Sequence, residues 1–118
     1  MHITGFIHCA STEGKTIQIG EGCLFSNNIV IRNGDSHSVL SLEGKRINPA
    51  QDVVIGKHVR IGQNVTILKG ATIGEDSVIA TGTIVTGKKF EGKAVLGGTP
   101  ARIVKQNINW DSNIIQSR

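Results

Sequence analysis

The sequence predicts an all-β protein built as a parallel β-helix, in which short strands stack coil upon coil. A row of aliphatic residues recurs at a strict six-residue interval: Ile55, Ile61, Ile67, Ile73, Ile79 and Val85. The same phase appears earlier, at Ile19, Phe25 and Ile31. A six-residue period fits neither an α-helix nor an ordinary strand. It is typical of a β-helix in which each hexad makes one strand and one corner.

Two further columns of the hexad support this fold, counted from the aliphatic residue as position 1. Position 4 holds residue types that tolerate a positive φ, as a left-handed corner requires: Gly22, Asn28, Gly34, His58, Asn64, Gly70, Asp76 and Gly82. Position 5 holds small or β-branched residues suited to a crowded inward corner: Cys23, Ile29, Val59, Val65, Ala71, Ser77 and Thr83. Because three columns agree, the prediction does not depend on aliphatic spacing alone.

The 118 residues predict one domain in three segments. Residues 1–16 are expected to form one strand, with Ile3, Phe6 and Ile7 as its apolar positions, and a loop. Residues 17–96 are expected to form the coils, with a loop excursion near residues 38–52 where the corner column is broken. Residues 97–118 are expected to cap the open end as a short helix or tail, since Pro100 suits a helix start.

Composition excludes several classes of protein. The formal net charge is +4, but no aromatic platform or recognition helix accompanies the basic residues, which argues against nucleic acid as a partner. Cys9 and Cys23 do not suggest a disulfide framework. No stretch approaches the roughly 18 apolar residues of a membrane span. No basic segment followed by an apolar run opens the chain. We therefore expect a cytoplasmic protein without a membrane span.

His37 is the best catalytic candidate. It falls in the phase of the inward column, one hexad after Ile31, and it opens the expected loop. An imidazole fits an aliphatic rung poorly, so the chain is expected to have left the prism there. From the residues alone, His37 is either a catalytic base or a loop histidine with a local hydrogen bond. Asp35 either fixes the tautomer of His37 or caps a turn.

The hexads resemble those of a known family. Ile61-Gly62-Gln63-Asn64-Val65-Thr66 and Ile73-Gly74-Glu75-Asp76-Ser77-Val78 resemble the hexapeptide-repeat acyltransferases. The resemblance implies a left-handed helix of triangular section with about three to four coils. Gly34-Asp35-Ser36-His37-Ser38, followed by Gly44-Lys45-Arg46-Ile47-Asn48-Pro49-Ala50, is similar to the sugar and polysaccharide O-acetyltransferase branch. There the resemblance implies that His37 is the catalytic base.

The resemblance also implies acetyl-CoA as co-substrate. The stretch from Ala80 to Lys88 and the box from Gly98 to Arg102 match segments that bind the cofactor in the family. By this match, the cofactor is bound by Ala80, Thr81, Thr86, Lys88, Arg102 and Lys105. Cationic side chains bind phosphates through charge-assisted hydrogen bonds. The alternative for each charged residue is a solvated surface.

The implied reaction transfers an acetyl group to a hydroxyl of a sugar or glycan in a homotrimer. A neutral histidine can remove the hydroxyl proton near neutral pH. Direct attack on the thioester is the simpler mechanism, since no nucleophile elbow or reactive cysteine motif is present.

Two departures from the family leave an alternative open. Arg60 replaces the usual Trp of the acyl-CoA groove, and the chain before the first clear coil is short. The alternative is a non-catalytic or truncated β-helical scaffold. A zinc site of three histidines shared across a trimer is not expected, since none of the four histidines form a His-x4-His pair.

Overall fold

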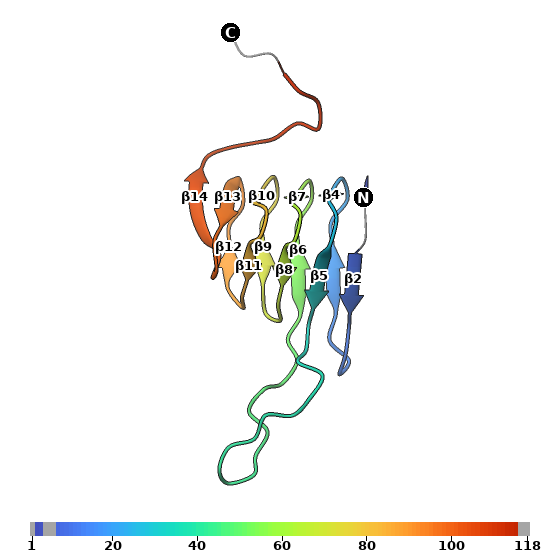
Figure 1. Cartoon of the computed structure of the whole chain (residues 1–118), viewed down its shortest axis with the longest axis vertical. Helices are drawn as coiled ribbons and strands as arrows, with labels where there is room; N and C mark the ends of the chain where they lie inside the picture. The colour runs from blue at the N-terminus through green and yellow to red at the C-terminus, as the bar shows by residue number, and fades with distance from the viewer. Residues whose placement is uncertain (1, 4–6, 116–118) are drawn as a thin grey trace.

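The computed structural model of the chain describes residues 2–3 and 7–115. Within these residues the regular structure is entirely β-strand, which confirms the predicted all-β class. The strand position expected for Phe6 lies outside the described residues. Figure 1 shows the strands stacked side by side in one prism, with a long loop leaving it on one side and the C-terminal tail on the other.

The strands form three sheets, one on each side of the prism. In spatial order, the first sheet holds β1 (His2–Ile3), β4 (Leu24–Phe25), β7 (Arg60–Ile61), β10 (Val78–Ile79), β13 (Ala94–Gly97) and β14 (Arg102–Gln106). The second holds β11 (Ile84–Val85), β8 (Thr66–Ile67), β5 (Ile29–Arg32) and β2 (Ile7–Ala10). The third holds β12 (Lys89–Phe90), β9 (Thr72–Ile73), β6 (Val53–Ile55) and β3 (Ile17–Ile19).

Every third strand lies in the same sheet, so three strands make one coil. The pairs are parallel from β1 to β13, as a β-helix requires. Among the described residues, β1 to β12 make four coils and β13 begins a fifth. The coils also begin earlier than residue 17, because β2 already pairs with β5 through Ile7 and Ile29. The six-residue pattern does not predict this first coil, because the turn after β2 interrupts the repeat.

The core consists of the two inward columns. The position 1 residues from Phe25 to Val85 are buried, and Ile19 at the N-terminal end is partly buried. The position 5 residues from Cys23 to Thr83 are all buried as well. Stacked aliphatic rungs therefore replace the aromatic core that this composition cannot supply.

The predicted corners have the expected backbone. Seven of the eight position 4 residues have a positive φ, and they are Gly22, Asn28, His58, Asn64, Gly70, Asp76 and Gly82. Gly34 is the exception: the positive φ falls instead on Ser36, at 69°. The reason is that the chain has already left the regular coil at this point, so the hexad register no longer sets the backbone.

The predicted loop excursion is confirmed and is slightly longer than expected. It joins β5, which ends at Arg32, to β6, which begins at Val53. Its outer part is a hairpin, in which Leu40 and Arg46 form an antiparallel bridge. We call residues 33–52 the active loop, and the prism edge between the second and third sheets the loop edge.

The end of the chain is a strand followed by a tail. The prediction was a short helix or a tail, and the helix, which was expected from Pro100, is wrong. β14 pairs antiparallel with β13 and covers the last edge of the first sheet. Ile103 and Val104 are β-branched, which favours a strand over a helix. The tail then runs back along the prism, where the Trp110 ring stacks on the His58 ring at 3.9 Å between centroids.

Candidate functional site

The base of the active loop is tied to the first coil by a buried amide. Asn33 is fully buried, and its side-chain oxygen accepts a hydrogen bond from the Thr12 backbone N–H at 2.8 Å. Its amide nitrogen donates to the Ser11 hydroxyl at 3.0 Å. The Gln51 N–H donates to the Asn33 carbonyl at 2.9 Å, which joins the two ends of the loop. The two ends of the loop are therefore held together and fixed to the first coil at the point where the loop leaves the prism.

Asn48 is the hub of the loop above this base. Its amide nitrogen donates to the Asp35 carboxylate at 3.0 Å and to the His37 carbonyl at 2.7 Å. Its oxygen accepts from the Val39 N–H at 2.7 Å and from the Arg46 Nε at 3.1 Å. Asn48 is only 7% exposed, and an amide has two donors and two acceptor positions. Its hydrogen-bonding capacity is therefore filled inside the loop.

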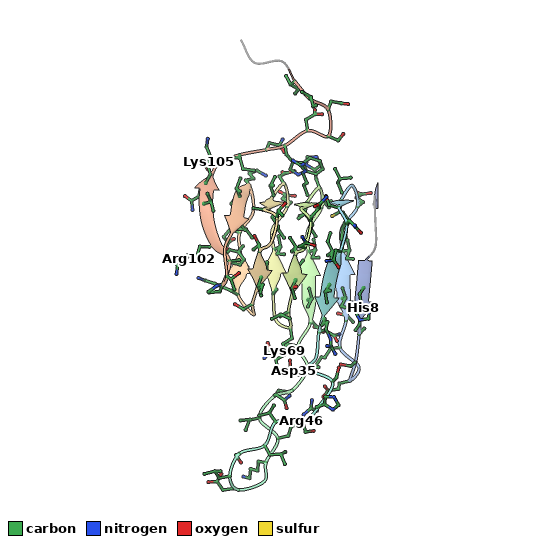
Figure 2. The ribbon with its side chains drawn as sticks, in the orientation of Figure 1. His8, Asp35, Arg46, Lys69, Arg102 and Lys105 are labelled. Carbon is green, nitrogen blue, oxygen red and sulfur yellow. The ribbon has the colours of Figure 1, made fainter. Side chains whose placement is uncertain are left out.

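Lys69 ties the loop to the third coil. It lies on the loop edge, just after β8, and its ammonium donates to the Asp35 carboxylate at 2.6 Å and to the Pro49 carbonyl at 3.2 Å. Figure 2 shows Lys69 and Asp35 meeting where the loop joins the prism. The hydrogen bond from Lys69, and then the one from Asn48, lower the pKa of the Asp35 carboxyl. Since an ordinary aspartate has a pKa of about 3.9, Asp35 is ionised throughout the neutral range.

Arg46 makes a third tie, to the turn after β2. Its guanidinium pairs with the Glu13 carboxylate through both terminal nitrogens. Arg46 also donates to the Asn48 carbonyl at 3.2 Å. The hydrogen bond from Arg46 lowers the pKa of Glu13, and the same bond raises the pKa of Arg46. The pair is charged at neutral pH and is partly exposed.

His37 is exposed on this held loop, and its main-chain carbonyl is fixed by Asn48. The Asp35 carboxylate accepts hydrogen bonds from Lys69 and Asn48, and among the described residues it accepts none from the His37 imidazole. Next to His37, the Arg32 guanidinium donates to the Ser36 hydroxyl. The imidazole is therefore open to a ligand, while the chain on both sides of it is anchored.

The residues expected to bind acetyl-CoA lie on three different edges of the prism. Ala80 and Thr81 follow β10, and Arg102 lies near them, since it is paired with Gly97 and the Cβ of Ala80 lies close to Gly97. Thr86 and Lys88 follow β11 on the loop edge, in line with Lys69 and the active loop.

Lys105 is paired with Val95, at the opposite end of β14 from Arg102. Figure 2 shows these two cations well apart. One prism therefore brings Thr86 and Lys88 to the edge that carries His37, and it does not gather all six residues.

The sequence reasoning missed the residues that hold the loop. Asn48 was part of the segment that resembled the family, but no role was assigned to it. Lys69 and Glu13 carry no local signal, because their partners lie 34 and 33 residues away. Only the stacking of the coils brings these partners together.

Comparisons with known proteins agree with the fold. The family model described as bacterial transferase hexapeptide (six repeats) matches residues 52–87. The polysialic acid O-acetyltransferase of Neisseria meningitidis is 44% identical over 106 residues, which cover 89% of this chain and 49% of the relative. The chain therefore spans about half the length of this curated relative.

Solved structures extend the match to almost the whole chain. The polysialic acid O-acetyltransferase OatWY has a TM-score of 0.81 at 38% identity, covering 98% of this chain and 60% of that one. A hexapeptide-repeat acetyltransferase from Vibrio cholerae O1 biovar eltor, complexed with acetyl coenzyme A, has a TM-score of 0.58 at 29% identity, covering 91% and 72%. The fold is thus the left-handed β-helix that was predicted. The hexapeptide-repeat transferase model thus covers part of the chain, and similarity to polysialic acid O-acetyltransferases extends over most of it.

Over the described ranges, residues 2–3 and 7–115, no helix has the length and apolar character needed to cross a membrane.

Proposed function

We propose that this protein transfers an acetyl group from acetyl-CoA to a hydroxyl of a glycan, with His37 as the general base. The observation that carries the proposal is the exposed imidazole of His37 on a loop that is anchored to the first and third coils. A general base must be accessible to its substrate and held in place, and the active loop supports both requirements.

In the proposed reaction, the neutral imidazole of His37 accepts the proton of the acceptor hydroxyl as its oxygen attacks the thioester carbonyl carbon. The carbon–sulfur bond then breaks, and the imidazolium returns the proton to the departing sulfur. The products are an acetyl ester and free CoA, and His37 is neutral again. General base catalysis of this kind contributes about 10²–10⁴-fold to the rate.

The cofactor is proposed to lie along the loop edge, where Thr86 and Lys88 are exposed in line with the active loop. Successive coils are about 4.8 Å apart, so an extended thiol arm can follow this edge from β11 toward His37. Ala80, Thr81, Arg102 and Lys105 remain proposed ligands, and their different edges support a cofactor that touches more than one prism.

The acceptor is proposed to be an anionic glycan, and polysialic acid is the first one to test. The matched relatives are named for this acceptor, and the net charge of this chain is +4. A positive field attracts a polyanion over a distance of about 8–10 Å at physiological salt. Asp35 is proposed to hold the loop, since its carboxylate is already engaged by Lys69 and Asn48.

A homotrimer is proposed as the assembled form. Outward-facing side chains on the strands include half-buried apolar residues such as Leu24, Val30 and Ile84. The tip of the active loop also exposes apolar side chains, with Leu42 fully exposed. Packing between prisms would shield both groups from water.

The test compares wild type with His37→Ala and with His8→Ala, which removes an exposed histidine of β2. We expect His37→Ala to lower kcat by at least about 10²-fold, while calorimetry gives an acetyl-CoA affinity within about twofold of wild type. His8→Ala should match wild type in both measurements.

Turnover retained by His37→Ala would remove the histidine from its role. A folded protein that fails to bind acetyl-CoA in large excess would favour the scaffold alternative.

A further inference from the structure

We infer that Asn48 is the positioning residue of His37, and that Lys69 supports it through Asp35. The inference rests on the proposed role of His37 as the base. It goes beyond that role because it assigns the placement of the imidazole to a side chain that does not touch the reacting atoms.

The geometry of the hub carries the inference. One amide binds three alternate residues of the loop: the side chain of Asp35, the carbonyl of His37 and the N–H of Val39. The chain from residue 35 to 39 is therefore held on one side at regular intervals. Because the backbone is fixed on that side, the side chain of His37 is free to face outward, and it is exposed.

Burial makes this hub costly to disturb. Asn48 is almost completely buried, so a lost hydrogen bond leaves a polar group without water. Its neighbours are also fixed: Arg46 donates to both the side chain and the carbonyl of Asn48 while it binds Glu13. The hub is thus held between the first coil and the loop, and it has little freedom to shift.

Lys69 completes the support from the third coil. It binds the same Asp35 oxygen that accepts from Asn48, and it also binds the carbonyl of Pro49, the residue after the hub. A cation at this place fixes Asp35 relative to the prism. The chain on both sides of His37 is therefore held in place relative to the coils, on which Thr86 and Lys88 also lie.

The first test replaces Asn48 with Asp, which keeps the shape and the acceptor oxygens but removes both donors and faces Asp35 with a like charge. Asn28→Asp is the matched control, because Asn28 also donates its amide to a neighbouring side chain, Asn64 at 2.7 Å, but at a corner outside the active loop. We expect Asn48→Asp to lower kcat by about 10²-fold with KM for acetyl-CoA nearly unchanged, because a misplacement of about 1 Å costs that much. Asn28→Asp should retain wild-type kcat.

The second test uses Lys69, in case Asn48→Asp fails to fold. Lys69→Met should lower kcat by about tenfold, and Lys69→Arg should restore most of it, because the conservative variant keeps a cation beside Asp35. Lys57→Met, at an exposed lysine of another corner, should have no effect. A folding defect alone would not be rescued selectively by Arg.

A readout without catalysis separates this inference from the proposed function. The Val39 amide donates to the side-chain oxygen of Asn48, so its hydrogen exchange should be at least about tenfold faster in Asn48→Ala, which removes this acceptor, than in wild type. If wild type is inactive but this amide behaves as expected, the hub exists and the proposed function fails. If wild type depends on His37 but Asn48→Asp and Lys69→Met keep kcat within about twofold, the inference is overturned. An unchanged Val39 exchange rate would also overturn it.

Discussion

At the scale of the residue, the buried position 5 column contains a polar side chain, Thr83, at a place where other coils have an apolar one. Thr83 is fully buried and its hydroxyl oxygen has no hydrogen-bond partner among the described residues. Val65 holds the equivalent place one coil earlier and is buried as well. A buried hydroxyl without a partner costs free energy, and a valine of nearly the same shape avoids that cost.

We therefore predict that Thr83→Val raises the free energy of unfolding by about 1 kcal/mol. Urea unfolding followed by circular dichroism measures the change, with Thr16→Val, at an exposed threonine before β3, as the control near zero. A loss of stability of similar size in Thr83→Val would mean that its hydroxyl has a partner in solution.

At the scale of the element, an aromatic pair joins the C-terminal tail to a corner of the prism. The Trp110 ring lies parallel to the His58 ring, with 8° between their planes, and its indole N–H donates to the His58 carbonyl at 2.7 Å. The His58 ring in turn contacts the Asp76 carboxylate through Nδ1 at 2.9 Å. A stacked pair of this kind contributes about 0.5–1.5 kcal/mol beyond its buried area.

Trp110 is the single tryptophan of the chain, so its fluorescence reports on the tail alone. We predict that His58→Asn moves the emission maximum to longer wavelength and increases quenching by acrylamide, because the indole loses its stacking partner. Asn is chosen since it tolerates the positive φ of 53° at this corner. His8→Asn is the control, and an unchanged spectrum in His58→Asn would show that the tail does not depend on this contact.

The elements differ in how far the sequence predicts them. The coils from β4 to β11 were predicted because every hexad repeats three columns, and each column reports a local requirement of the backbone or the core. Residues 1–16 were predicted as one strand and a loop, but they hold two strands, β1 and β2, because the turn at 11–16 interrupts the period before it is established. β14 was assigned to a helix or tail because its pairing with β13 depends on an open sheet edge, which a local pattern does not reveal.

The residues of the candidate site also differ in how far the sequence predicts them. His37 was found because it breaks a column, and its exposed place on the loop agrees with that reasoning. Asn48 and Lys69 were not found, because their roles arise from contacts across 13 and 34 residues. The cofactor residues were expected from the resemblance, but their separation over three edges appears only when the coils are stacked.

At the scale of the molecule, a narrow prism leaves apolar side chains on its outer faces and on its loop. Val39, Leu40 and Ile47 are each at least half exposed, around the fully exposed Leu42. Several exposed apolar side chains on one loop commonly mark an interaction site. The proposed assembly of several prisms would bury these side chains and would also bring the proposed cofactor ligands from different edges near one another.

We predict that light scattering coupled to size-exclusion chromatography gives a mass of about three times 12.6 kDa at micromolar concentration. Leu42→Glu should lower that mass, because it places a charge in the buried contact. A mass of 12.6 kDa for wild type across the concentration range would contradict the trimer.

The most direct measurement of the central claim follows the acetyl group itself. Wild type and His37→Ala are each incubated with polysialic acid and acetyl-CoA labelled with ¹³C in the acetyl carbonyl, and the glycan is then analysed by NMR. We predict labelled acetyl esters on the glycan with wild type and a rate lower by at least about 10²-fold with His37→Ala. Equal labelling by both proteins, or none from folded wild type that binds acetyl-CoA, would contradict the account.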